Sequence, residues 1–207
     1  MTNPSLWRFR GPKILASKSA VRLALLEAAA LPVTVRPAEV DERALEAQFL
    51  ADGGKPGALA RHLAGEKALA VSRAAPDALV LGADQTLTLS DKLLHKATNR
   101  TEAADRLKRL AGRRHRLTSA VAIARGGALL GVIEDRAEMT VRALGPRSVD
   151  AYLDAAGEGA LQSVGGYELE GVGIHLFSRI VGAHETVLGL PMLPLLAWLR
   201  DEDLIGP

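Results

Sequence analysis

The stretch ALVLGA, residues 78–83, is the feature that most constrains the fold of this chain. The run is continuous, apolar and of the length of a strand. A strand without polar alternation is buried on both faces, as in the middle of a sheet that helices cover on both sides. The sequence therefore predicts a central strand at this position.

Segments of strand and helix character alternate along the rest of the chain, which predicts an α/β fold. A Pro at position 37 suits a strand at the edge of the sheet. Ser19 and Thr101 are the expected N-caps of two helices. We expect further strands at residues 13–16, 33–40, 115–124, 128–143 and 174–181. We expect helices at residues 19–30, 42–51, 57–75, 101–112, 148–156 and 191–200.

Composition limits the class of protein. The 207 residues suffice for one large domain or two small lobes with a proper core. Leu, Val and Ala must fill that core, because 48% of the residues are hydrophobic and only 3% are aromatic. The net charge of +2 is too weak to indicate nucleic-acid binding, and the lack of cysteine excludes disulfides and thiolate sites. There is no apolar run of membrane length and no signal core, so we expect a soluble, cytoplasmic protein.

Two hydroxyls and two cations gather in LASKSAVR, residues 15–22, where the first strand passes into a helix. The start of a helix carries free N–H groups and positive partial charge. Ser17 and Ser19 can cradle a phosphate there, with Lys18 and Arg22 neutralising it. The alternative is that Ser19 only caps the helix while the two cations point into solvent.

Asp84 follows the central apolar run in LVLGADQT. Ligands of α/β sheets collect at the carboxyl ends of strands. A carboxylate at the end of this strand can bind a divalent metal or act as a general base. The alternative is an Asp that forms a turn after Gly82.

Other charges are dispersed along the chain. Asp41 and Glu42 follow the second expected strand, Lys67 lies in an Ala- and Leu-rich helix, and Lys96 follows LLH. Each alone is more often a surface charge. With Asp84 they provide the two cations and three carboxylates that suit a Mg²⁺–triphosphate site. The five histidines lack zinc-site spacing, and neither a Walker loop nor a G-x-S-x-G elbow occurs.

The order of these motifs resembles that of the Maf-like nucleoside triphosphate pyrophosphatases. The chain departs from the family pattern at Ala20 and Ala97, where the family has proline, and at Val21, where arginine is frequent. We hypothesise that Lys18 partly takes the place of such an arginine in binding phosphate. The matching segments cover almost the whole chain: LASKSAVR, VDE at 40–42, EKA at 66–68, GADQ at 82–85, Lys96, TEAADRLKRLAGRRH at 101–115, GGYELEGVG at 165–173 and GLP at 189–191.

The resemblance implies a single domain over residues 1–207, with a mixed twisted sheet in two lobes around a deep cleft, similar to inosine triphosphate pyrophosphatases. It implies hydrolysis of a nucleoside triphosphate to the monophosphate and diphosphate with Mg²⁺, as house-cleaning of non-canonical nucleotides. Asp84 falls at the proton-acceptor position, and Glu42 and Asp84 near the metal. Phosphate-contacting positions correspond to Ser17, Ser19, Arg22, Lys67 and Lys96. We further expect a homodimer that binds neither nucleic acid nor membrane.

Three residues bear on which base is recognised. Gln85 and Glu170 resemble the branch linked to 7-methyl-GTP, whereas Tyr167 resembles the dTTP/UTP branch. A carboxylate near the cationic 7-methylguanine would gain Coulomb energy that a neutral Gln would not. The alternative for Glu170 is a solvated turn residue.

Two other classes of function compete with the enzyme. One is a regulatory cell-division scaffold with a vestigial site, against which the intact Asp84, Lys67 and Lys96 argue. The other is a nucleic-acid binder that uses the basic stretch at residues 106–116. That stretch has five arginines but no aromatic residue for stacking, so a solvated helix face is the simpler interpretation.

Overall fold

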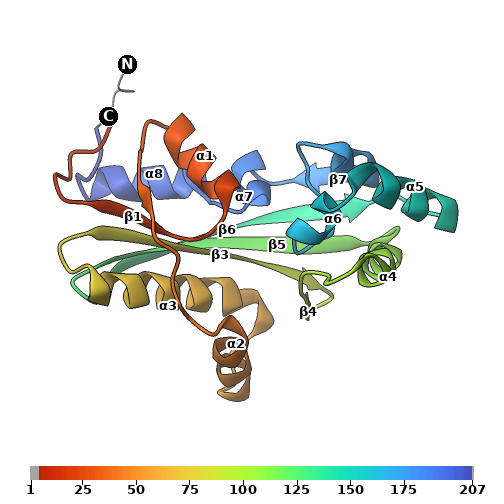
Figure 1. Ribbon diagram of the computed structural model, residues 1–207, viewed down its shortest axis with the longest axis horizontal. Helices are drawn as coiled ribbons and strands as arrows, with labels where there is room; N and C mark the ends of the chain where they lie inside the picture. The colour runs from red at the N-terminus through yellow and green to blue at the C-terminus, as the bar shows by residue number, and fades with distance from the viewer. Residues whose placement is uncertain (1–4, 207) are drawn as a thin grey trace.

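The computed structural model describes residues 5–206 and has a mixed α/β fold (Figure 1). Within these residues one sheet of seven strands has the order β2-β1-β3-β5-β6-β7, with β4 paired to β3. The strands are β1 (Lys13–Ala16), β2 (Thr34–Val35), β3 (Leu79–Leu89), β4 (Lys92–Leu94), β5 (Arg114–Arg125), β6 (Ala128–Val141) and β7 (Phe177–Val181). β1 pairs in parallel with β2 and β3, whereas the other pairs are antiparallel. The predicted mixed α/β sheet is confirmed; the likeness to inosine triphosphate pyrophosphatases stays a prediction.

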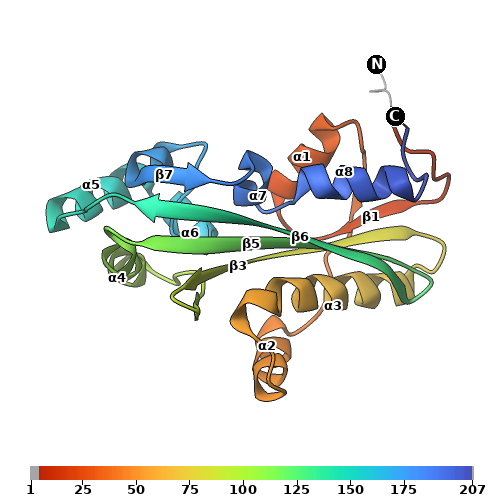
Figure 2. The same cartoon turned by 180° about the vertical axis from the view of Figure 1, so that it is seen from behind.

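Helices cover both faces of the sheet. The longest helix, α3, lies along one face, while α1, α7 and α8 lie over the other (Figures 1 and 2). The helices are α1 (Ala20–Ala28), α2 (Glu42–Ala51), α3 (Leu59–Ala74), α4 (Arg100–Leu110), α5 (Pro146–Ala156), α6 (Gly159–Gln162), α7 (His184–Leu188) and α8 (Met192–Asp201). Two 3₁₀ turns are η1 (Pro56–Ala58) and η2 (Val172–Leu176). Within residues 5–206, no helix combines the length and hydropathy that a membrane crossing requires.

The predicted central strand is confirmed, but it is longer than expected. β3 runs on to Leu89 and keeps pairing with β5 as far as Thr88, whereas β1 ends at Ala16, opposite Gly82. The expectation that Asp84 closes a strand is therefore wrong, because it lies inside β3. It nevertheless lies just past the carboxyl end of β1, where the parallel part of the sheet stops.

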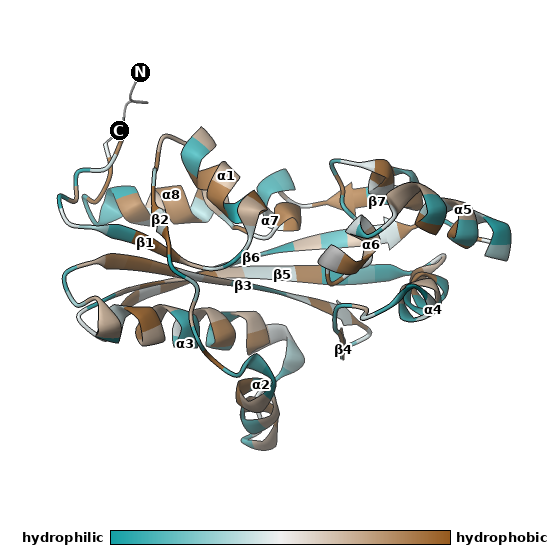
Figure 3. Cartoon of the chain, in the orientation of Figure 1, coloured by the Kyte–Doolittle hydropathy of each residue, from teal (hydrophilic) through white to brown (hydrophobic). Residues whose placement is uncertain are grey.

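Leucine, valine and alanine make up most of the core, as the composition predicts. Apolar residues are prominent along β3, whereas α4 is largely polar (Figure 3). Small residues let α3 approach the sheet closely: Ala60, Ala64 and Ala68 of the helix pack with the alanines at positions 120, 122 and 124 of β5.

Gly82 marks the closest approach of α3 to β3. A Cβ atom built on Gly82 would lie 2.3 Å from the carbonyl oxygen of Ala64 and 2.5 Å from the amide nitrogen of Ala68. Real side chains do not tolerate such distances, so any larger residue would force helix and strand apart. Gly82 therefore sets the spacing between the two elements.

Several element ends differ from the expectation. The N-cap of α4 is Asn99, not Thr101, because the Asn99 side chain accepts a hydrogen bond from the amide of Glu102 at 2.9 Å. The edge strand at 33–40 shrinks to β2, since only two residues pair with β1. Residues 172–176 form a 3₁₀ turn, so the last strand begins at Phe177. The predicted cap at Ser19 is confirmed, since its hydroxyl accepts from the amide of Arg22.

We predict that Gly82→Ala lowers the free energy of unfolding by about 1–3 kcal/mol, because the added methyl group collides with the backbone of α3. Gly65→Ala in α3 is the matched control. Its Cβ would lie 3.7 Å from Cδ1 of Leu129, which is ordinary contact, and alanine favours a helix by about 0.5–1 kcal/mol. Urea unfolding should show a lower free energy of unfolding for Gly82→Ala and a higher one for Gly65→Ala, each relative to the unaltered chain. Equal stability of Gly82→Ala and the unaltered chain would contradict the steric account.

Candidate active site

A cavity of about 1030 Å³ opens beside the carboxyl end of β1. Its walls come from the β1–α1 turn, α2, α3, β3, the segment after β4, and the loop at residues 163–171. All nine residues predicted for the site line this one cavity: Ser17, Ser19, Arg22, Glu42, Lys67, Asp84, Gln85, Lys96 and Glu170. The tertiary structure thus brings together residues that are spread over most of the chain.

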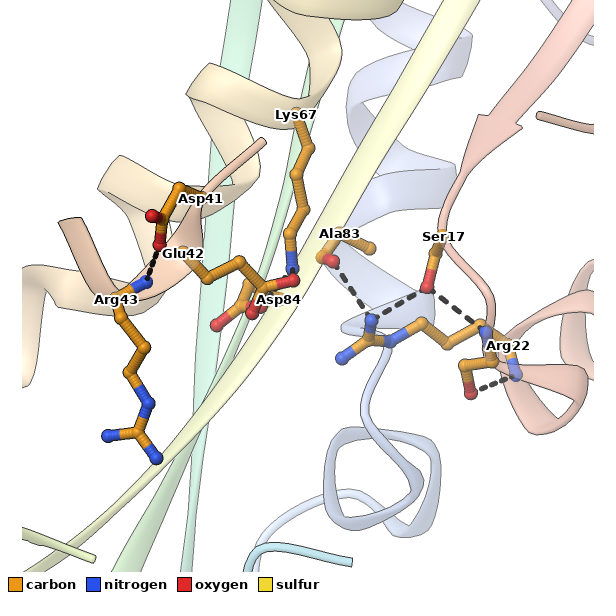
Figure 4. Close-up of polar contacts among 9 residues, drawn as sticks. Ser17, Arg22, Asp41, Glu42, Arg43, Lys67, Ala83 and Asp84 are labelled. Carbon is orange, nitrogen blue, oxygen red and sulfur yellow. Dashed lines mark hydrogen bonds and ion pairs between the residues drawn. The ribbon is translucent and has the colours of Figure 1, made fainter. Parts of the chain in front are cut away.

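A buried ammonium group lies at the centre of the site. Lys67 reaches from α3 so that its Nζ lies 2.6 Å from Oδ1 of Asp84 and 2.9 Å from Oε1 of Glu42 (Figure 4). Lys67 and Asp84 are only 8% and 7% exposed, whereas the Glu42 side chain is half exposed. A buried charge without a partner is strongly unfavourable, so the three side chains hold one another in place.

The position of Asp84 changes its proton affinity. Burial raises the pKa of Asp84 above its usual value, and the repulsion from Glu42 adds to this, while Lys67 and Arg22 act against it. Within residues 5–206, Oδ2 of Asp84 has no protein donor, whereas Oδ1 accepts from Lys67. The carboxylate therefore has one oxygen held by the protein and one that can accept a hydrogen bond from a ligand.

The turn between β1 and α1 supplies the second part of the site. The amide of Ser19 donates to the hydroxyl of Ser17 at 3.3 Å, and the hydroxyl of Ser19 accepts from the amide of Arg22. The first turn of α1 contains no acidic residue. The positive end of the helix therefore has no acidic side chain in its own first turn to balance it.

Arg22 ties this turn to two other elements. Its Nη1 donates to the hydroxyl of Ser17 and to the carbonyl oxygen of Ala83, both at 2.9 Å (Figure 4). Its Nε donates to the carbonyl oxygen of Gly189 at 2.8 Å. Burial lowers the pKa of Arg22, but the guanidinium stays charged because its ordinary value is so high. The alternative in which Arg22 points into solvent is thus excluded.

The two acidic residues of the motif VDE, Asp41 and Glu42, have different roles. Asp41 caps α2 and accepts from the amides of Arg43 and Ala44 at 3.1 and 3.0 Å. Glu42 begins the helix and turns its carboxylate to Lys67. Asp41 therefore aims Glu42 at the site without lining the main cavity.

Two further cations lie at the rim. Lys18 and Lys96 are exposed and line the cavity. Within residues 5–206, neither of them forms an ion pair. They remain available to a negatively charged ligand.

Gln85 faces the opposite side of β3 from Asp84. Its Nε2 lies 3.0 Å from the hydroxyl of Ser119 and 3.1 and 3.0 Å from the carbonyl oxygens of Thr186 and Val187. These contacts anchor α7 to the sheet. Gln85 lines the cavity, but its amide nitrogen is engaged with the protein, so contact with a ligand would fall to the amide oxygen.

Glu170 is exposed on the loop at residues 163–171 and lines the cavity. Its Oε1 lies 3.6 Å from Nε2 of His184, an exposed pair of little energetic weight. Glu168 of the same loop also lines the cavity, but its carboxylate lies toward α6, where Oε2 would be 3.2 Å from a Cβ built on Gly159. The loop thus brings two acidic residues to this wall of the site, whereas the β1–α1 turn is basic.

The sequence did not point to three other residues that line the cavity. Oε1 of Glu46 in α2 lies 3.2 Å from Nε2 of His95 across one side of it. Thr86, two residues after Asp84 in β3, has a buried hydroxyl that finds no hydrogen-bond partner among the described residues. Glu46 stands in no motif with recognisable chemistry. Thr86 and His95 lie close in sequence to Asp84 and Lys96, but only the fold shows that they line the cavity.

A divalent cation fits the donor set. Mg²⁺ prefers oxygen ligands and is usually held by one or two carboxylates together with substrate phosphates. Glu42 and Asp84 present oxygens around one nitrogen, and the hydroxyl of Thr86 is unpartnered nearby on the same strand. Among residues 5–206 no group of three or more acidic or histidine side chains forms a metal site by itself. The protein would therefore bind the ion with the help of a ligand.

Comparison with known proteins identifies the family of this chain. The profile of the Maf family, described as Maf-like protein, matches residues 12–202. A protein of Rhodopseudomonas palustris named nucleoside triphosphate pyrophosphatase is 48% identical over 98% of this chain and 99% of its own. One from Nitrobacter winogradskyi with the same name is also 48% identical over 98% and 99% of the two chains. A 7-methyl-GTP pyrophosphatase of Rhizobium etli is 47% identical over 93% and 96%. This chain therefore belongs to the Maf family.

Proposed function

We propose that this protein hydrolyses a nucleoside triphosphate between its α- and β-phosphates, giving the monophosphate and diphosphate. The observation that carries the proposal is the buried Lys67–Asp84 pair, which lies in the same cavity as the anion-binding start of α1. The names of the close relatives, nucleoside triphosphate pyrophosphatase and 7-methyl-GTP pyrophosphatase, support it.

Asp84 acts as the general base. Its Oδ1 is held by Lys67, and Oδ2 accepts a hydrogen bond from water and takes the proton as the water oxygen attacks phosphorus. The raised pKa of Asp84 makes the carboxylate a better proton acceptor than an exposed aspartate. One bond to phosphorus forms, the anhydride bond breaks, and diphosphate leaves with the electron pair.

The cations bind the phosphates and stabilise the charge of the leaving group. In the inner part of the site, Lys67 and Arg22 are balanced by Asp84 and Glu42. A triphosphate adds several negative charges, so further positive charge is needed. The exposed Lys18 and Lys96, the positive end of α1 and a divalent cation supply it.

Glu42 and Asp84 would hold Mg²⁺ together with the substrate phosphates. When bound, the ion withdraws charge from the phosphate oxygens and helps to orient the triphosphate. Lys67 sets the spacing of the two carboxylates, because its ammonium contacts both. A single group thus organises both the general base and the metal ligands.

The acidic loop at residues 163–171 favours a substrate with a positively charged base. We propose a modified nucleotide of the 7-methyl-GTP kind, with dTTP or UTP as the second candidate because Tyr167 resembles that branch. The preference for a methylated base depends on the carboxylate of Glu170, which lines the cavity. House-cleaning of modified nucleotides, a homodimer and a location in the cytoplasm stay predictions from the resemblance.

Asp84→Asn should lower kcat for diphosphate release by at least about 10²–10⁴-fold, because the amide cannot accept the proton. Asp105→Asn is the control, since Asp105 is exposed on α4 and forms a surface ion pair with Lys108. The measurement is diphosphate release with Mg²⁺ over a panel of ordinary and modified nucleoside triphosphates. Release by Asp84→Asn at the rate of the unaltered enzyme would contradict the role of the base, and release by neither protein would favour the scaffold.

Lys67→Gln should move the acidic limb of the kcat/KM pH profile upward by about 1–3 pH units. Activity needs the carboxylate form of Asp84, so it falls as the pH drops through the pKa of that group. Lys67 opposes the rise of this pKa, and its removal therefore lets the pKa rise further. An acidic limb that stays in place or moves to lower pH would show that Asp84 is not the group that titrates.

Glu170→Gln should lower the preference for 7-methyl-GTP over dTTP by about fivefold in relative kcat/KM, because one favourable charge interaction of about 1 kcal/mol is removed. Glu168→Gln tests whether the effect belongs to position 170 or to the charge of the loop in general. The two ratios are compared under identical Mg²⁺ and salt. An unchanged ratio in Glu170→Gln would exclude this carboxylate as the source of base preference.

A further inference from the structure

The loop at residues 163–171 forms the wall of the cavity that lies away from the phosphate-binding turn. Gly165, Tyr167, Glu168 and Glu170 all line the cavity, yet none of them belongs to a helix or strand. A loop that shapes a binding site needs to be held in one conformation by the surrounding elements, because an ordering cost would otherwise weaken binding.

Neighbouring helices hold the backbone of this loop. Arg106 of α4 donates from Nη1 to the carbonyl oxygen of Val164 at 2.7 Å. Tyr152 of α5 donates from its hydroxyl to the carbonyl oxygen of Gly166 at 2.9 Å. These two hydrogen bonds fix the backbone of the loop, but neither of them involves the side chain of Tyr167.

His115 of β5 supplies that contact. Its Nε2 lies 2.6 Å from the phenol oxygen of Tyr167, and the histidine is only 2% exposed. Its ring also packs near Phe177, whose ring meets that of Tyr167 edge-on with centroids 4.8 Å apart. His115 itself does not line the cavity, whereas Tyr167 does. Tyr167 therefore connects His115 of the sheet to the cavity.

The pair is neutral. Burial lowers the pKa of His115 to about 4, so the imidazole carries one proton at neutral pH. Burial also raises the pKa of Tyr167, which keeps the phenol protonated. Nδ1 of His115 has no hydrogen-bond partner, so the bond to Tyr167 is the one polar contact of this ring in the described part of the chain.

We propose that His115 is a positioning residue that fixes Tyr167, and with it the cavity face of the 163–171 loop, so that it governs how tightly the nucleoside end of the substrate is bound. The inference rests on the proposed function. The phosphates belong at the β1–α1 turn and Lys67, so the nucleoside extends toward the loop. His115 is remote from Asp84 along β5, since Asp84 pairs with Ala120. Substitution of His115 should therefore leave the rate of proton transfer to Asp84 unchanged.

The test compares His115→Phe, which removes the hydrogen bond but keeps a ring, with His115→Gln, whose amide can bond to the phenol. His115→Phe should raise KM for the best nucleoside triphosphate about tenfold, the size expected when a buried hydrogen bond is removed, with kcat within about twofold. His115→Gln should restore most of the affinity. Tyr167→Phe removes the same hydrogen bond by deleting the phenol oxygen, so it should raise KM as much as His115→Phe does. The variant with both substitutions should have the same KM as either single variant.

Inorganic tripolyphosphate separates the two ends of the cavity, because it lacks a nucleoside. Its inhibition constant should be the same in the unaltered enzyme and in all four variants if only the nucleoside end is affected. A nucleotide KM within about twofold of the unaltered enzyme in both His115→Phe and Tyr167→Phe would overturn the proposal. An equal weakening of tripolyphosphate binding would also overturn it, since it would show general damage to the fold.

Amide hydrogen exchange tests the same link without any catalysis. In His115→Phe, residues 163–171 should exchange faster, while α3 should be unchanged. If the unaltered protein hydrolyses no nucleoside triphosphate, the proposed function fails, and the exchange result alone decides the link between His115 and the loop. Unchanged exchange of the loop would overturn the link.

Discussion

The close packing of α3 against β3 at Gly82 is the constraint on which the rest of the site depends. The lack of a side chain lets the turn of α3 from Ala64 to Ala68 lie directly on the strand. Lys67 belongs to that turn, and its ammonium ends at Asp84, two residues beyond Gly82. A buried cation is stable only with anionic partners, so Asp84 and Glu42 are drawn to it. The close packing of the α3 and β3 backbones thus determines where the charges of Lys67, Asp84 and Glu42 lie.

That arrangement explains the basic start of α1. Lys67, Arg22, Asp84 and Glu42 balance one another, so the inner site has no strong charge of its own. The positive end of α1, Lys18 and Lys96 remain without an anion from the described part of the protein. Under the proposed function, a triphosphate would neutralise these groups together. In the proposed binding mode, the phosphates would lie at the turn and the nucleoside would lie near Tyr167 and Glu170, which line the other side of the cavity.

Much of the fold could be predicted because it depends on local patterns. The apolar run at 78–83 marked the central strand, and the hydroxyl of Ser19 marked the start of α1. The length of β3 could not be predicted, because Gln85 to Thr88 stay extended through pairing with β5, a distant segment. Asn99 rather than Thr101 caps α4, since either residue suits a cap and the surrounding chain decides between them. The order of the motifs pointed to nine site residues, and all nine line one cavity.

The sequence by itself determined the alternation of helices and strands, the family and the residues from which the site is built. Those properties depend on residue types and their order along the chain. Only the tertiary structure decided that Lys67 contacts both carboxylates, that Arg22 is tied to Ala83 and Gly189, that Gln85 anchors α7, and that His115 reaches the cavity through Tyr167. The physical reason is that these contacts join residues distant in sequence. Their energies depend on distance and burial, which exist only after helices have packed on the sheet.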